Sequence, residues 1–181
     1  MTNNKHIIGI TGPIASGKGT AAAYLEKVHG AANFRYSTML RDILRRLHIP
    51  ETRTNIVNMS VALRGAYGED QLAKTMAEDI KSSSHSLIVI EGIRRKEDLM
   101  HISNIPGFTL VSIDAPQKTR HSRLCQRREN EDDATKTFAD FLLDHQKPTE
   151  ITIPEVMAKA TKNIDNSGNL AALYSQLDTL V

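Results

Sequence analysis

The stretch GPIASGKGT, Gly12–Thr20, decides the fold of this chain, together with the apolar run Ile7–Ile10 before it and the helical run Thr20–Val28 after it. The phosphate-loop pattern has a glycine, four free residues, a second glycine, a lysine, and then a serine or threonine. Both glycines and the lysine fit this spacing. Gly19 stands where the hydroxyl residue is expected, and Thr20 supplies a hydroxyl one position later. The order therefore predicts a strand, a phosphate-binding loop and a helix.

The chemistry of such a loop explains its spacing. Glycines allow successive backbone N–H groups to turn inward around an anion, and the helix that follows points its positive end at the same anion. Lys18 adds a full positive charge on the outer phosphates. The loop therefore predicts a nucleoside triphosphate site, and the alternative is a glycine-rich turn that binds nothing. The residues expected to bind the nucleotide are Gly12, Ala15, Ser16, Gly17, Lys18, Gly19 and Thr20.

The composition is ordinary for a soluble globular protein, with 40% apolar and 24% charged residues. The length of 181 residues predicts a single domain over residues 1–181. A net charge of +2 does not call for nucleic-acid or membrane binding. The single cysteine, Cys125, excludes an intramolecular disulfide and a cysteine-ligated zinc site. No signal peptide or membrane span is recognisable, so the expected location is the cytoplasm.

Strand and helix signals alternate along the chain. Such alternation predicts an open parallel α/β sheet with helices on both faces, and ligands that bind beyond the carboxyl ends of its strands. Residues 38–82 and 116–153 are expected to form helical insertions hung on this sheet. The predicted strands are His6–Thr11, Phe34–Ser37, Ser86–Glu91, Phe108–Asp114 and Lys162–Asp165.

A first polar cluster follows the second predicted strand, in the segment Tyr36–Arg41. Ser37 or Thr38 can cap the helix that starts there. Arg41 lies about one turn into that helix, near the carboxyl end of the strand. It is either a phosphate ligand for an acceptor substrate or a solvated helix arginine.

A second cluster, Ile90–Arg95, ends the third predicted strand. A carboxylate such as Glu91, at the tip of a strand beside a phosphate loop, can hold the water shell of Mg²⁺. Arg94 and Arg95 offer planar donors for a phosphate. The alternative interpretation is a helix start whose arginines face solvent.

A third cluster places Arg120, Arg123 and Arg127 on one helix face, with Arg128 next to them and the acidic run Glu129–Asp133 after them. These arginines indicate either a lid that closes over a transferring phosphoryl group or a solvated charged face. Because the phosphate loop precedes them, the lid is the favoured interpretation.

Taken together, these segments resemble the small P-loop kinases that include adenylate kinase and dephospho-CoA kinase. Gly17-Lys18-Gly19-Thr20 looks like the adenylate-kinase form of the loop, and Tyr36–Arg41 is similar to that family's acceptor segment. Glu91-Gly92-Ile93-Arg94-Arg95 looks like its Asp-Gly-Phe-Pro-Arg segment. Asp114–Arg127 resembles the start of its lid, and Ile164–Gly168 the closing strand of dephospho-CoA kinases. The order is nearest to adenylate-kinase-related proteins, mostly archaeal.

The resemblance implies a three-layer P-loop kinase fold with strand order 2-3-1-4-5, Mg-ATP as the donor and a nucleotide-like small-molecule acceptor. It implies catalytic roles for Lys18, Glu91, Arg123 and Arg127. Further nucleotide contacts are implied for Arg120 and Asn166, and metal contacts for Thr20 and Glu91. The implied acceptor ligands are Ser37, Arg41, Arg64, Arg94 and Arg95. The state expected is a monomer or a homodimer that binds neither membrane nor nucleic acid.

The acceptor depends on whether a general base is present. A hydroxyl acceptor such as dephospho-CoA benefits from one, but Phe34–Arg41 contains no acidic residue and Asp42 is the first. A phosphate acceptor needs only cations. The sequence therefore favours a nucleoside or deoxynucleoside monophosphate kinase over a dephospho-CoA kinase. A binding module that hydrolyses ATP slowly stays open, and an RNA-binding use of the 120–128 helix is weaker because acidic residues follow it.

Overall fold

One or more helices follow each strand in the computed structural model, which describes residues 5–127, 133–148 and 150–181. Arg128 and residues 129–132 of the predicted acidic run lie outside the described residues. The elements are β1 His6–Thr11, α1 Lys18–His29, β2 Ala32–Arg35, α2 Tyr36–Arg46, α3 Arg53–Tyr67, α4 Gln71–Ser82, β3 Leu87–Glu91, α5 Lys96–Leu99, β4 Phe108–Asp114, α6 Gln117–Arg127, the 3₁₀ turn η1 Asp133–Thr135, α7 Phe138–Asp144, α8 Ile153–Met157, β5 Lys162–Asp165 and α9 Leu170–Asp178.

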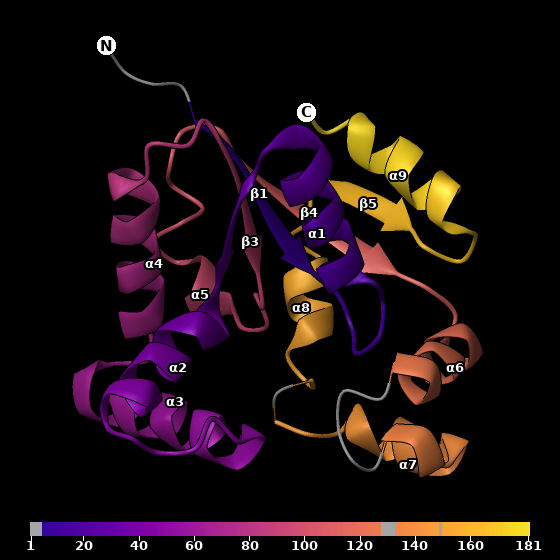
Figure 1. The fold of residues 1–181 in the computed structure, drawn as a ribbon, viewed down its shortest axis with the longest axis horizontal. Helices are drawn as coiled ribbons and strands as arrows, with labels where there is room; N and C mark the ends of the chain where they lie inside the picture. The colour runs from indigo at the N-terminus through magenta and orange to yellow at the C-terminus, as the bar shows by residue number, and fades with distance from the viewer. Residues whose placement is uncertain (1–4, 128–132, 149) are drawn as a thin grey trace.

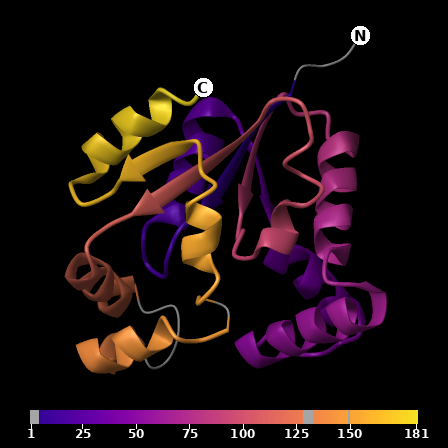
Figure 2. The same cartoon turned by 180° about the vertical axis from the view of Figure 1, so that it is seen from behind.

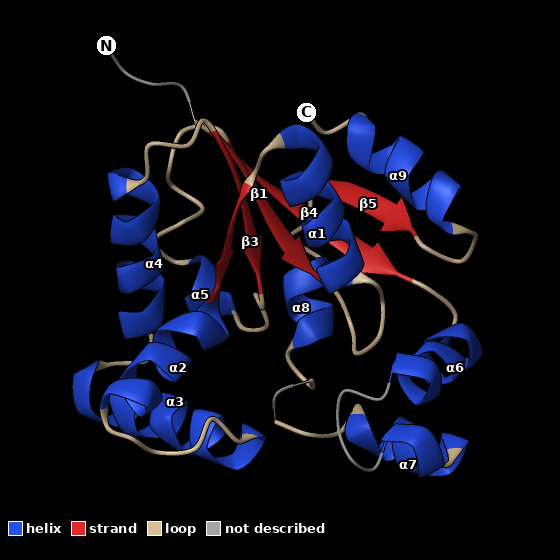
Figure 3. Ribbon diagram, viewed as in Figure 1, coloured by secondary structure: helices blue, strands red, loops and turns tan. Residues whose placement is uncertain are grey.

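The five strands form one parallel sheet in the order β2-β3-β1-β4-β5, which confirms the predicted topology. Figure 3 shows the strands running side by side with helices around them. Strand β1 is central, with Ile8 opposite Val89 of β3 and Thr109 of β4. Its apolar run suits a strand that is covered on both faces. The phosphate loop therefore leaves the sheet at its centre.

Helices cover both faces of the sheet (Figures 1 and 2), and a hydrophobic core lies on each face. Helices α1 and α9 pack on one face, where Ile8, Ile10 and Leu25 are fully buried. Helices α4, α5 and α8 pack on the other face, around Ile7 and Ile90. Alternate residues of β1 thus point to opposite cores, as the period of two in a strand requires.

The predicted bounds of the second strand were wrong, and the third strand begins one residue later than predicted, at Leu87. The strand expected over Phe34–Ser37 is β2, Ala32–Arg35, and Tyr36 already begins α2. Arg35 lies opposite Glu91, the last residue of β3, so no strand continues beside it. Ser37 consequently stands in the first turn of a helix.

The phosphate loop follows the carboxyl end of the central strand β1. The loop between β1 and α1 lies between the α2–α3 pair on one side and the α6–α7 pair on the other (Figure 1). Within the described part of the chain, no helix is long and apolar enough to cross a bilayer.

Candidate functional site

The Gly12–Thr20 loop needs glycine at two positions. Gly12 has φ +149° and Gly17 has φ +105°, in the region that side chains disfavour. A Cβ on Gly12 would lie 2.1 Å from the carbonyl oxygen of Ile113, and one on Gly17 would lie 2.1 Å from Nδ2 of Asn166. Ala15, with φ +58°, is left-handed although it is not glycine. This backbone strain is typical of loops that are shaped for a ligand.

Two side chains from distant parts of the sequence brace the loop. Asn166 is buried and donates from Nδ2 to the carbonyl of Ser16 at 2.8 Å. Arg120 is buried and donates from Nη1 to the carbonyl of Ile14 at 3.1 Å. The resemblance implied direct nucleotide contacts for Asn166 and Arg120. In the structure both side chains donate to backbone carbonyls of the loop and so help to fix the direction of its N–H groups.

The loop's own side chains fit a phosphate chain. The Ser16 hydroxyl is fully buried, and Oγ has no hydrogen-bond partner among the described residues. Lys18 donates from Nζ to the carbonyls of Gly12 at 2.6 Å and Pro13 at 2.8 Å. A buried hydroxyl without a partner costs free energy unless a ligand satisfies it. Neutral carbonyls are weaker partners for an ammonium than phosphate oxygens.

The positive charge of Lys18 is disfavoured by its surroundings. Burial and the nearby guanidinium of Arg94 lower its pKa to about 7, although the carboxylates of Glu150 and Glu91 oppose the shift. Because a triphosphate would place negative charge beside Nζ, it would favour the protonated form.

Glu91 lies beside the first turn of α1. Its Oε1 accepts from Nδ2 of Asn33 at 3.1 Å and from Nε of Arg35 at 2.8 Å. Its other oxygen, Oε2, would lie 3.7 Å from a Cβ on Gly19. Glycine at position 19 thus leaves space between α1 and this oxygen, and Thr20 is exposed nearby. The donors fit Mg²⁺, which is bound through one or two carboxylates together with substrate phosphates and water.

The partners of Glu91 were not among the residues predicted from the sequence. Asn33 and Arg35 are the polar residues of the short strand β2, and β3 pairs with this strand. In the sequence, the sign of these two residues is that polar residues alternate with apolar ones along β2, the edge strand that pairs with β3. Without the strand register, that signal does not identify which carboxylate they contact.

The turn after β3 is fixed by Asp98 of α5. Oδ2 of Asp98 accepts from the backbone N–H of Arg94 at 3.0 Å and of Arg95 at 3.1 Å. The side chain of Arg95 donates to Glu69 at 3.1 Å, and that of Arg94 donates to Glu150. The turn therefore holds both arginines at the carboxyl end of β3.

The other predicted acceptor ligands lie in different settings. Arg41 is half-exposed and pairs with Glu51 at 3.3 Å. Arg64 is buried and pairs with Asp98 at 2.8 Å, so its guanidinium joins α3 to α5. Ser37 is half-buried at the start of α2. Arg41 thus remains accessible to a ligand, whereas Arg64 has a structural contact.

The arginines of α6 also differ in how far they are exposed and in what they contact. Arg123 is half-buried and donates to the carbonyls of Asn166 at 2.8 Å and Gly168 at 3.3 Å, so α6 is tied to the loop before α9. Arg127 is exposed at the end of α6. Burial lowers the pKa of Arg120, and Asp114 opposes this shift.

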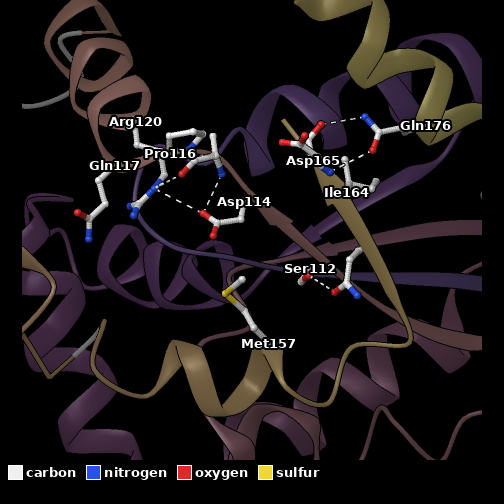
Figure 4. Close-up of a pocket in the computed structure, with 11 residues that line it drawn as sticks. Ser112, Asp114, Pro116, Gln117, Arg120, Met157, Ile164, Asp165 and Gln176 are labelled. Atoms are coloured by element: carbon white, nitrogen blue, oxygen red, sulfur yellow. Dashed lines mark hydrogen bonds and ion pairs between the residues drawn. The ribbon is translucent and has the colours of Figure 1, made fainter. Parts of the chain in front are cut away.

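Two adjacent cavities lie beside this site. The larger, about 700 Å³, opens at the carboxyl ends of β4 and β5, where Arg120 points toward Asp114 (Figure 4). The smaller, about 470 Å³, reaches the phosphate loop at Pro13 and is lined also by Glu150 and His145. Of the two, the smaller has a loop residue in its lining, and neither lining includes a loop glycine. Within the described residues, no three acidic, histidine or cysteine side chains gather as a metal cluster.

Known proteins resemble this chain in sequence and in fold. A family model described as "AAA domain" matches residues 8–142. A UPF0200 protein of Methanothermobacter thermautotrophicus is 29% identical over 96% of this chain and 87% of its own. Shikimate kinase from Bacteroides thetaiotaomicron has a TM-score of 0.64 at 16% identity, over 97% of this chain and 96% of its own. A gluconokinase from Sinorhizobium meliloti has a TM-score of 0.57 at 13% identity, over 99% and 93%. The chain therefore has the P-loop kinase fold.

Proposed function

The chain belongs to the AAA domain family, whose model matches residues 8–142, and we propose that it is an ATP-dependent phosphotransferase. It moves the γ-phosphoryl group of Mg-ATP to a nucleotide-like small molecule, most simply a nucleoside or deoxynucleoside monophosphate. The observation that carries this proposal is the phosphate loop itself, which joins a buried hydroxyl without a partner to Lys18 and to the Glu91 oxygen facing Gly19.

The donor half of the reaction is assigned to the loop and to its neighbours. The backbone N–H groups of the loop hold the phosphates, Lys18 neutralises the outer ones, and Asn166 and Arg120 keep the loop in shape. Glu91 and Thr20 would hold Mg²⁺, which stabilises the charge that develops during transfer. Arg123 and Arg127 supply further cations from residues 116–153, which we assign as the lid of a single domain.

The acceptor half is assigned to residues 38–82 and to the turn after β3. Ser37, Arg41, Arg94 and Arg95 are the proposed ligands, and the structure leaves Arg41 half-exposed. The ion pair with Asp98 gives Arg64 a supporting role within this half.

The carboxylates near the acceptor segment favour a phosphate over a hydroxyl acceptor. Asp42 is exposed and pairs with Arg45 at 2.9 Å, on the outer part of α2. One oxygen of Glu91 is held by Asn33 and Arg35. A hydroxyl acceptor would need one of these carboxylates as its general base, whereas the proposed phosphate acceptor needs none.

A product screen tests the proposal. The purified protein is incubated with Mg-ATP and each nucleoside monophosphate in turn, and separately with dephospho-CoA, and the products are identified by mass. We expect a diphosphate from one or a few monophosphates, and no product with Lys18→Ala. Phosphorylated dephospho-CoA alone would assign the hydroxyl acceptor instead. ATP hydrolysis without any phosphorylated acceptor would leave an ATPase module.

A further inference from the structure

An acidic side chain holds one of the proposed acceptor arginines from a distant part of the chain. Glu150 is 56 residues from Arg94 in sequence, and it accepts a hydrogen bond from Nη1 of Arg94 through Oε1. Thr152 donates from its hydroxyl to the carbonyl of Arg94 at 2.8 Å. Residues 150–152 thus contact both the side chain and the backbone of Arg94.

The pair is unequally buried. The Glu150 side chain is 3% exposed, whereas the Arg94 side chain is 38% exposed. Among the described residues, Oε2 of Glu150 has no hydrogen-bond partner although it is buried. When only one oxygen of a buried carboxylate accepts a hydrogen bond, the free energy lost with its hydration is only partly recovered. Solvent therefore reaches the cation, while the anion that holds it is poorly solvated.

Glu150 lies near two further cations, Arg120 and Lys18, although the carboxylate of Asp114 lines the same cavity. It lines the smaller cavity together with Pro13 of the phosphate loop and with Arg120. Its charge acts on Lys18, where it opposes the lowering of the lysine pKa. The negative charge of Glu150 thus lies near the same cations that a negatively charged ligand would contact.

We propose that Glu150 is a specificity-determining residue that pairs with Arg94 and yields it only to a ligand carrying a phosphate group. The inference rests on the proposed function in one respect, that Arg94 belongs to the acceptor site. An entering phosphate displaces a carboxylate from a guanidinium, and it brings more charge and more acceptor oxygens than the carboxylate it replaces. A neutral acceptor offers no such exchange. Glu150 thus selects acceptors with a phosphate ester.

The test measures phosphate binding rather than catalysis. Inorganic phosphate is titrated into the full chain, which is saturated beforehand with Mg²⁺ and a non-hydrolysable ATP analogue so that the phosphate loop is filled. We expect Glu150→Gln to bind phosphate about tenfold more tightly than the wild type, since the competing charge is gone. Glu155→Gln removes an exposed carboxylate from α8 and is the matched control, with no expected change.

Two further variants keep the result decisive. Glu150→Asp retains the charge but shortens its reach to Arg94, so its phosphate affinity should lie between those of the wild type and Glu150→Gln. Arg94→Ala combined with Glu150→Gln should abolish the gain. Unchanged or weaker phosphate binding by a folded Glu150→Gln would overturn the proposal and leave Glu150 as a support for Arg94. Failure of the proposed kinase activity would appear separately, in the product screen.

Discussion

Binding of a triphosphate to the Gly12–Thr20 loop should take up a proton at Lys18. In the ligand-free protein the pKa of Lys18 is about 7, because burial and then Arg94 disfavour the ammonium. Phosphate oxygens beside Nζ should return the pKa toward its ordinary value of 10.5. The proton must then come from solvent at any pH between these two values.

The size of this uptake follows from the pKa. At pH 8, one unit above a pKa of about 7, about one tenth of Lys18 is protonated before binding, so about 0.9 proton should be taken up. At pH 6 the uptake at Lys18 should be only about 0.1 proton. Above pH 7 the dissociation constant should rise by about tenfold for each pH unit. The same shift makes folding stability rise with pH through this window, since the unfolded chain then binds more protons.

Calorimetry in buffers of different ionisation enthalpy measures the proton count directly. Mg-ATP or a non-hydrolysable analogue is titrated at pH 6 and pH 8, and the heat is plotted against the buffer enthalpy. Lys18→Arg is the control, because its guanidinium stays charged at both pH values. The proton exchange measured with this variant is therefore that of the ligand itself. Equal proton uptake by the wild type and Lys18→Arg at pH 8 would refute the reasoning.

Four other substitutions, with one control, probe the rest of the site. Glu91→Gln should raise the Mg²⁺ concentration needed for half-maximal activity and leave thermal stability nearly unchanged; an unchanged magnesium titration would remove Glu91 from the metal site. Gly17→Ala should abolish ATP binding in an equilibrium titration, since its Cβ would meet Asn166 at 2.1 Å, whereas Gly65→Ala, with nothing within 4 Å of its Cβ, should bind ATP normally. Arg64→Ala should lower the free energy of unfolding by about 3–5 kcal/mol in denaturant melts because it breaks a buried ion pair. Arg41→Ala should instead raise KM for the acceptor with little loss of stability, and equal destabilisation by both variants would contradict this division.

The sequence predicted the fold well because its signals were local. A β-branched run before a glycine-rich turn specifies a buried parallel strand and the loop after it, whatever the rest of the chain does. The strand order followed from the resemblance and is confirmed. The end of β2 was misplaced because it depends on where β3 ends, and that is set by the pairing of Arg35 with Glu91.

The side-chain partners could not be predicted in the same way. Asp98 and Glu150 reach the Arg94–Arg95 turn from positions 4 and 56 residues away from Arg94, and only folding brings the second one close. Composition and spacing marked the arginines as candidates, because a cation for phosphate is a property of the residue itself. Whether an arginine is accessible, as Arg41 is, or buried, as Arg64 is, depends on tertiary packing.

The two halves of the proposed site hold their cations differently, and this difference has a mechanistic consequence. Lys18, on the donor side, is held by two neutral carbonyls, so an incoming triphosphate displaces no anion. On the acceptor side, Arg41, Arg94 and Arg95 each contact a glutamate. An acceptor must therefore replace a charged partner, which requires a ligand of at least equal negative charge. Donor binding is thus governed by the protonation of one lysine, and acceptor binding by competition between phosphate and the protein's own carboxylates.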